Sequence, residues 1–588
     1  MKNKNKLLVT TALEKTWGKN EEIIFLGDWC VPYEKEKLIK KRKFNIIKYH
    51  WSNKRKKMND RTEIEKIYFE IFEYLSIKLN KLHDVNENKE YWRTLLFPWL
   101  MYYCTIIFDR WENLQNLFKI KKSKNFNQIK INNLDFKIED FHKDWLSKIY
   151  SDEWNHNLYN QIIDYKYSNR VKNIKYLKYF NKNNLKIKRE NIFNKYIKNN
   201  FYKFLFKLGL MFNKFLIENP YTSRLNLLRL YISTFQLPIF ISNNSFLDDN
   251  TNSRDFTDIR NKLKFDKNRK NKNIINFIKL NLYHDLPMSI VENFNHFKKN
   301  TPSLRKKIIF GTSLFYSNTC FKILVAEAKK NKSKFYLQEH GGSLFQEINT
   351  IYDKELLNIT DGLINHSLKK KIKNFKLPRL DLLKYIDFKR TSKSNLLIVA
   401  NETVRYHQKN YHLPTGPENQ IEYLEIKSLI KNLSQKIKNK IILRNKKDLG
   451  YSLSKKIKKD FSDIRISILN EKKHIDVELK KTKLILCTYP ETTISQALAS
   501  GIPTVIFLSK KIYNNFHEKK IIKILKKNKI FFDDTYKLSY HINSVWNNID
   551  SWWLQKDVVR SREFYLRSFD IKNNWLKEWS NFLKKTLR

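Results

Sequence analysis

The sequence predicts an α/β protein with two doubly wound parallel domains and a large helical insertion in the N-terminal half. Short apolar runs alternate with helical patterns at the N-terminus, again after residue 302, and again after residue 393. Strands separated by helices are typical of parallel βαβ units. The chain has 588 residues, which exceeds what one hydrophobic core usually serves, so at least two domains are expected.

The first predicted domain covers residues 1–393. Its runs KLLVTTAL (6–13) and EIIFLGDW (22–29) have the length and apolar content of buried strands. From about 60 to 300, aromatic and aliphatic residues recur at helical spacing, which predicts the insertion. After Pro302, the segments KKIIFGTS, TCFKILVAEAKK and SKFYLQEHGG are predicted as strand, helix and strand.

The second predicted domain covers residues 394–540. Its predicted strands begin with SNLLIVANE and continue with KIILRN and KLILCTYPETT, with helices between them. The remaining 541–588 form a Trp-rich helical tail, which we expect to pack back on the N-terminal half.

The chain is strongly basic, with 115 Lys and Arg against 59 Asp and Glu and a formal net charge of +56. Nucleic-acid binding is one interpretation of such charge. However, Lys, Asn and Ile dominate every segment, which favours compositional drift, and no zinc finger, RNP-like segment or P-loop is present. We therefore expect no nucleic-acid partner, while the charge favours peripheral contact with an anionic membrane.

Compartment and membrane topology follow from local features. The four cysteines show neither C-x-x-C pairs nor a disulfide framework, which fits a reducing cytoplasm. The basic N-terminus has too short an apolar run for a signal peptide. The apolar segment 94–108 is too short to span a bilayer and contains Pro98, so a buried core helix is predicted. A cytoplasmic protein, with the inner-membrane surface as a further contact, is expected.

The segment TYPETT (488–493) follows an apolar strand and precedes the helical run ISQALAS. Thr492 or Thr493 is predicted to cap this helix, and Gly501 to close it. Amide groups at a helix start beside a sheet edge bind anions, so a phosphate is expected there. Glu491 would repel phosphate and is expected to face a ribose or sugar hydroxyl. An ordinary capped helix is an equally good interpretation.

The segment QEHGG (338–342) lies at the end of another predicted strand. His340 has an ordinary pKa near neutrality and suits proton abstraction from a hydroxyl, with Glu339 orienting it or acting as the base. Gly341 and Gly342 allow a turn or a close backbone approach. A structural histidine in a tight turn is the alternative.

Two arginines follow predicted strands of the second domain. Arg405 and Arg444 have the side chain that pairs with a diphosphate in bidentate fashion. The alternative is that both are solvated basic residues, as elsewhere in this chain. No D-x-D metal motif is found in a suitable loop, and no metal is expected.

In their order along the chain, several segments resemble a family of transferases encoded with bacterial surface-polysaccharide genes for O-antigen and capsule. The resemblance covers nearly the full length. It rests on LLVTTALEKTW, FLGDWC, YWRTLLFPWLMYYCTIIFDRW, LPMSIVENF, AEAKKNKSKFYLQEHGG and TYPETTISQALASGIPTVIF.

The family is similar in design to two-domain GT-B glycosyltransferases. This implies two Rossmann-like halves, with a nucleotide sugar held mainly by the C-terminal half and the acceptor met by the N-terminal half. By resemblance to capsule and teichoic-acid polymerases, the role of base falls on His340. Gln496 stands near the place where many GT-B enzymes carry a ribose-binding glutamate, so the nucleotide is not implied.

The predicted function is therefore transfer of a sugar from a nucleotide-activated donor to a glycan or lipid-linked glycan acceptor. The donor is a substrate, and no cofactor is expected. Two alternatives stay open. One is transfer of a phosphopolyol from a CDP-linked donor by the same fold, and the other is a non-catalytic protein that binds a nucleotide or sugar.

Overall fold

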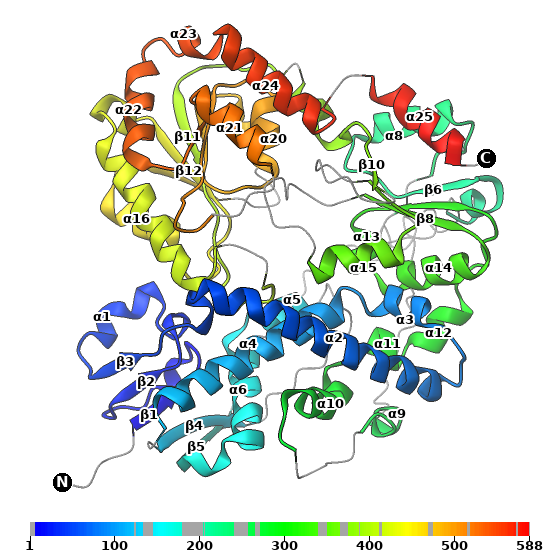
Figure 1. The fold of residues 1–588 in the computed structure, drawn as a ribbon, viewed down its shortest axis with the longest axis vertical. Coiled ribbons are helices and arrows are strands. Elements are labelled where there is room, and N and C mark those ends of the chain that lie inside the picture. Colours follow the sequence, from blue (N-terminus) through cyan, green and yellow to red (C-terminus); the bar gives the residue numbers. More distant parts are fainter. Residues whose placement is uncertain are drawn as a thin grey trace, which may run out of the picture.

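Three parallel sheets form the framework of the protein, which we describe from a computed structural model (Figure 1). The structure describes residues 6–122, 125–132, 145–178, 204, 206–239, 241, 257–264, 271–338, 350–364, 374–386, 388–410, 414–468, 474–513, 518–571 and 574–586.

The first sheet has five strands in the order β3-β2-β1-β4-β5, all paired in parallel. The strands β1 and β2 are the predicted apolar runs, and they are buried on both faces as parallel strands usually are. The strands are β1 (Lys6–Val9), β2 (Ile23–Phe25), β3 (Phe44–Ile46), β4 (Phe126–Asn132) and β5 (Val171–Lys178).

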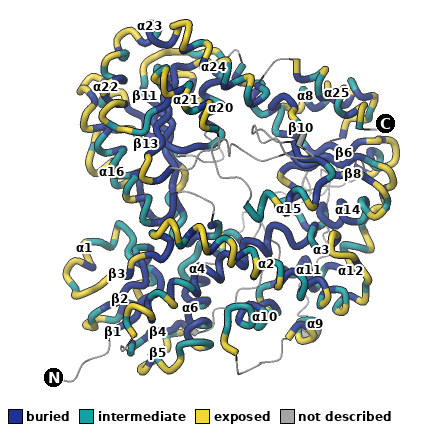
Figure 2. The backbone as a smooth tube through the Cα atoms, viewed as in Figure 1, coloured by how far each residue is buried: buried dark blue, intermediate teal, exposed yellow. Residues whose placement is uncertain are grey.

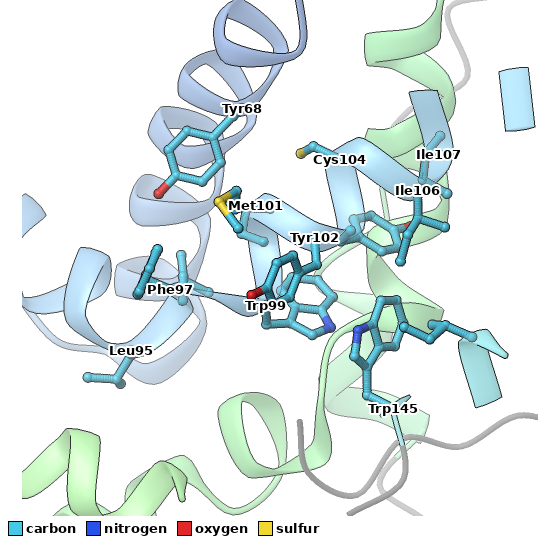
Figure 3. Close-up of a cluster of buried hydrophobic side chains, with 14 of the residues drawn as sticks. Tyr68, Leu95, Phe97, Trp99, Met101, Tyr102, Cys104, Ile106, Ile107 and Trp145 are labelled. Carbon is cyan, nitrogen blue, oxygen red and sulfur yellow. The ribbon is translucent and has the colours of Figure 1, made fainter. Parts of the chain in front are cut away.

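Long helices cover this sheet and connect it to the second one. The helix α2 (Lys54–His83) begins where the Asn53 side chain accepts the Lys56 N–H, and it packs along α4 (Trp99–Ile120). The apolar segment 94–108, predicted as one core helix, spans the end of α3 (Lys89–Leu96) and the first half of α4, and the Trp99 ring at the start of α4 lies 5.9 Å from the ring of Trp145 (Figure 3). Within the described ranges, every helix is too short or too polar to traverse a bilayer.

The second sheet also has five parallel strands, in the order β10-β9-β8-β7-β6. The helix α14 (Thr319–Lys330) connects β7 to β8, which confirms the predicted strand, helix and strand after Pro302. The strands are β6 (Phe215–Ile217), β7 (Ile308–Gly311), β8 (Lys334–Gln338), β9 (Gly362–Ile364) and β10 (Asn374–Phe375).

The third sheet has six parallel strands in the order β13-β12-β11-β14-β15-β16. Its strands are β11 (Asn395–Val399), β12 (Ile441–Asn445), β13 (Arg465–Ile468), β14 (Thr482–Cys487), β15 (Thr504–Phe507) and β16 (Phe531–Phe532). Its main helices are α16 (Gly416–Asn432), α18 (Leu453–Asp460), α20 (Thr492–Ala499), α21 (Lys519–Lys527), α22 (Thr535–Val545) and α24 (Lys556–Ser568).

The last helix, α25 (Trp575–Thr586), leaves the third sheet and packs on the second (Figure 1). The Trp579 ring lies 5.1 Å from the ring of Phe310 in β7, and Ser580 hydrogen-bonds Ser233 at 2.7 Å. The indole of Trp579 donates to the carbonyl of Pro378. The chain thus crosses back to the second sheet at its end.

The buried residues form two clusters. One runs through the first and second sheets, and the other belongs to the third (Figure 2). The predicted α/β class with parallel sheets is confirmed. The number of sheets differs from the predicted two, because residues 1–393 form two separate sheets. The stretch 60–300, predicted as helical, supplies β4 and β5 to the first of these sheets and β6 to the second. The strand β5 is mostly exposed and rich in lysine, so it lacks the apolar signal of a buried strand.

Candidate functional site

The start of α20 stands at the carboxyl end of β14, where ligands bind in open α/β sheets. Glu491 is the N-cap, with the extended angles φ −120° and ψ −175°, and its carbonyl accepts the Ile494 N–H at 3.1 Å. The prediction that Thr492 or Thr493 caps the helix is therefore wrong: they are the first two helical residues. Among the described residues, no side chain caps this helix, so its first amides are suited to an anion.

The loop before α20 is held to the neighbouring strand. The Thr488 hydroxyl donates to the carbonyl of Val399 at 3.2 Å and lies 3.4 Å from the Glu422 carboxylate. Thr493 is buried and hydrogen-bonds the phenol of Tyr489, whose pKa is raised by burial. Glu491 and Thr492 remain half-exposed. The loop is thus fixed, and the amide end of α20 stays accessible.

Two buried carboxyl groups lie at the same edge of the sheet. Glu402 follows β11 and accepts a hydrogen bond from the Asn445 amide at 3.1 Å. Burial raises its pKa to about 8, with a further rise from the charge of Asp448. Burial likewise raises the pKa of Glu422 to about 8, and the charge of Glu402 adds to this. Burial thus favours the protonated, uncharged form of both carboxyl groups, in which each can donate a hydrogen bond.

Several oxygens of this cluster have no hydrogen-bond partner within the described part of the chain. They are Asn401 Oδ1, Glu402 Oε2 and Glu422 Oε2. Buried polar atoms are normally paired, and strongly shifted pKa values gather at functional sites. These side chains are therefore candidate ligand contacts that the sequence prediction missed. The signal available was the polar triplet Asn-Glu-Thr directly after the apolar run LLIVA.

The other predicted residues of α20 take ordinary helical positions. Gln496 is half-buried one turn into the helix. Gly501 follows the C-cap with φ +67°, a left-handed conformation that glycine adopts at low cost. Its carbonyl accepts the indole N–H of Trp553 at 2.8 Å.

Arg405 connects the third sheet to the first. Its guanidinium lies 2.9 Å from Asp152 Oδ2, at the start of α6 (Asp152–Lys166). The Tyr406 hydroxyl donates to the other oxygen of Asp152 at 2.5 Å. Gly450, with φ +118°, allows this packing, because an added Cβ would lie 2.2 Å from the Arg405 Cγ. The charge of Arg405 is thus engaged by Asp152, and its predicted role at a diphosphate stays a prediction.

Arg444 lies inside β12, one residue before its end. It is 4% exposed, and its guanidinium donates to the Ser467 hydroxyl on the neighbouring strand at 3.2 Å. Burial lowers its pKa, while the charges of Glu478 and Tyr489 act in the opposite direction. It therefore supports the sheet beneath the α20 loop.

Contacts connect α20 to the second sheet. The buried Arg379 donates to Ser495 of α20 at 3.3 Å and forms a two-pronged ion pair with Asp381. Burial raises the pKa of Tyr221, which follows β6, and both Asp381 and Thr312 act on it. The ends of β6 and β7 thus lie near α20. Glu339, His340, Gly341 and Gly342 lie outside the described residues, directly after β8.

Residues 6–583 match the family described as LIC12162 family transferase. The chain belongs to this family. It is thus a member of a family of transferases, which are enzymes. No curated protein matches the chain.

Several solved structures show distant similarity to this family member. OtsA in its apo form has a TM-score of 0.30 and 10% identity, and the match covers 48% of this chain and 72% of that one. Spinosyn rhamnosyltransferase SpnG with spinosyn aglycone has a TM-score of 0.30 and 8% identity, and the match covers 50% of this chain and 76% of that one. The wall teichoic acid polymerase TagF has a TM-score of 0.28 and 12% identity, and the match covers 50% of this chain and 84% of that one.

Proposed function

We propose that this transferase moves a sugar from a nucleotide-activated donor to a surface-glycan acceptor, with the GT-B arrangement formed by the second and third sheets. One observation carries the proposal. A helix start that no described side chain caps stands at the carboxyl edge of the third sheet, beside the buried carboxyl groups of Glu402 and Glu422. Uncapped amides and the helix dipole attract negative charge, and a nucleotide sugar brings a diphosphate.

The donor's diphosphate would lie on the amides of Thr492 and Thr493, with the Thr492 hydroxyl as a further donor. Glu491 is half-exposed at the N-cap and would accept hydrogen bonds from a ribose or sugar hydroxyl. Gln496 is a second neutral contact for the same groups. Glu402 and Glu422, in the protonated form that burial favours, would donate hydrogen bonds to oxygens of the donor without repelling the diphosphate.

The acceptor hydroxyl would lie on the side of the second sheet. His340, oriented by Glu339, would accept the proton of that hydroxyl as its oxygen bonds to the anomeric carbon. The bond between that carbon and the diphosphate oxygen breaks, and the diphosphate leaves with the electron pair. A helix dipole and fixed donors stabilise this charge in the transition state. Removing a base of this kind typically costs about 10²–10⁴-fold in rate.

The test is a panel of nucleoside diphosphates and sugar nucleotides, followed by a transfer assay. A bound nucleotide raises apparent thermal stability by mass action, so one nucleoside should stand out. His340→Ala should keep this stabilisation and lose at least about 100-fold in transfer rate. Wild-type turnover by His340→Ala would refute the base, and no response to any nucleotide would refute the donor site.

The same assay separates the two alternatives. Stabilisation by CDP alone, with transfer from a CDP-linked polyol, would identify a phosphopolyol transferase. Nucleotide binding without transfer to any glycan would identify a non-catalytic binder.

We also propose that the protein contacts an anionic membrane, in the cytoplasm, through the end of the second sheet near α8 (Arg224–Ser233). The exposed apolar side chains there are Met211, Phe212, Leu225, Ile232 and Phe235. Phe235 is 89% exposed, and the Lys584 ammonium lies 5.5 Å from its ring. Apolar side chains next to lysines are typical of surfaces that bind anionic headgroups, and this contact would bring a lipid-linked acceptor near.

A further inference from the structure

A histidine and two carboxylates meet outside the proposed donor site. His50 lies in the short helix η4 (His50–Ser52), Asp60 in α2 and Glu112 in α4. One ligand atom of each lies within 4.8 Å of the other two. We propose that these residues form a binding site for a divalent transition-metal ion, with zinc as the best match.

The imidazole of His50 is oriented for this role. Its Nε2 lies 3.0 Å from Asp109 Oδ1, which fixes the ring and places the proton on Nε2. Its Nδ1 has no hydrogen-bond partner among the described residues, although the side chain is only 1% exposed. This Nδ1 faces Asp60 at 3.8 Å. A buried ring nitrogen without a partner, facing a carboxylate, offers two ligand atoms to a cation that lies between them.

The surroundings of Asp109 resemble those of a second-shell carboxylate at a metal site. Asp109 accepts hydrogen bonds from the Tyr49 hydroxyl at 2.7 Å and from the Arg110 guanidinium at 2.7 Å. It is therefore held in place while it orients His50. Histidine ligands of metals usually donate their other N–H to such a carboxylate, and loss of that partner costs about 10–100-fold in metal affinity.

A lysine now occupies the position between the two carboxylates. Lys56 Nζ lies 2.8 Å from Asp60 Oδ2 and 2.7 Å from Glu112 Oε2. Its side chain is 34% exposed, so the ammonium can turn to solvent when a metal ion enters. Asp60 is also held by a second hydrogen-bond donor, because the Trp51 indole N–H donates to it at 2.8 Å. The two carboxylates are thus paired with the Lys56 ammonium, whereas His50 Nδ1 has no partner among the described residues.

The ligand types favour zinc. Zinc binds imidazole nitrogen and carboxylate oxygen at about 2.0–2.2 Å, so its ligand atoms lie about 3.3 Å apart in a tetrahedral site. The 3.8 Å from His50 Nδ1 to Asp60 would shorten by about half an ångström, which a side-chain adjustment provides. One imidazole with two carboxylates also suits zinc better than magnesium or calcium, which prefer oxygen alone.

The site's position indicates its role. The start of α2, next to the site, contacts residues that belong to the part of the chain around the third sheet. Lys54 donates to the Lys511 carbonyl at 2.8 Å, and Asn410 donates to the Lys57 carbonyl at 3.2 Å. The ring of Tyr49, next to His50, stacks 5.7 Å from that of His407. A metal ion that joins η4, α2 and α4 would therefore stiffen the surface on which the third sheet rests.

The experiment is zinc titration of the full-length, chelator-treated protein, followed by calorimetry and by metal analysis after gel filtration. We expect one tightly bound zinc ion per chain and a raised unfolding temperature. The isosteric variants Asp60→Asn and Glu112→Gln should each weaken binding by at least 10–100-fold. Lys56→Met should tighten it by about 10-fold or more, because the competing ammonium is gone.

A matched control is His296→Gln, which removes an exposed histidine of α12 (Phe294–Lys299) and should leave zinc binding unchanged. Lys56→Met keeps the proposal testable even if a ligand variant fails to fold, because it predicts a gain. The absence of stoichiometric zinc in both the wild type and Lys56→Met would overturn the proposal. Equal affinity of the wild type and Glu112→Gln would do so as well.

Discussion

Removal of Arg405 tests whether that guanidinium holds the molecule together or binds a diphosphate. In the structure it lies 2.9 Å from Asp152, with both side chains less than a fifth exposed. Removing one partner of a fully buried ion pair costs about 3–5 kcal/mol. Asp152 keeps two other donors, the Ala12 N–H at 3.2 Å and the Tyr406 hydroxyl. We therefore expect Arg405→Met to lower the free energy of unfolding by about 2–3 kcal/mol.

The partner substitution gives the second arm of a double-mutant cycle. Asp152→Asn should cost a similar 2–3 kcal/mol, and the double variant little more than either alone, with a coupling of about 2 kcal/mol. Denaturant unfolding followed by tryptophan fluorescence measures these values. Arg465→Met is the matched control, since that arginine forms a surface pair with Glu478 and is 59% exposed, so its loss should cost less than about 1 kcal/mol.

Nucleotide affinity decides between the two roles. If Arg405 serves the junction, Arg405→Met and Asp152→Asn change the Kd for the preferred nucleoside diphosphate by the same small factor. A loss of 10-fold or more in Arg405→Met alone, with unfolding unchanged, would refute the ion-pair reasoning and restore the diphosphate role.

Three further substitutions have expected outcomes. Burial raises the pKa of Glu402 to about 8, so its contribution to stability is present below about pH 4.5 and is lost as pH rises through 8. Glu402→Gln should therefore gain stability relative to the wild type as pH rises from 5 to 9. A constant difference between the two proteins in denaturant titrations across that range would contradict this. Gly501→Ala should cost about 1 kcal/mol in denaturant unfolding, because φ is +67° while the space for a Cβ is open; no change would contradict the backbone argument. Phe235→Glu should fold normally and float several-fold less with vesicles containing anionic lipid, whereas unchanged flotation would remove this surface from the membrane contact.

The strands at the centre of the third sheet were predictable because they are short runs, rich in Ile and Leu, that are buried on both faces. The runs around β11, β12 and β14 have this pattern, and so do β1 and β2. The strands β4 and β5 were not predictable, because neither has a continuous apolar run. The interior strand β4 buries the polar side chains of Gln128 and Lys130, and the edge strand β5 is exposed along most of its length.

The candidate site was predicted in part for a similar reason. The start of α20 could be located because a strand, a polar turn and a helix follow one another within a few residues. Glu402 and Glu422 could not, since a single glutamate in a chain with 59 acidic residues has no distinguishing mark until its burial is known. His50, Asp60 and Glu112 come from three separate elements, so only the packing of α2 against α4 brings them together.

Thr492→Pro provides the most direct test of the donor site. Thr492 is the first helical residue, where proline fits, and Glu491 before it is already extended, as a residue preceding proline must be. The substitution therefore removes one backbone N–H and leaves the helix intact, while Thr492→Ala removes only the hydroxyl. Calorimetry with the preferred nucleoside diphosphate should show about 10–100-fold weaker binding for Thr492→Pro, the value of one hydrogen bond to a charged group, and a smaller loss for Thr492→Ala. Wild-type affinity in Thr492→Pro, with its unfolding also unchanged, would show that the donor's charge lies elsewhere.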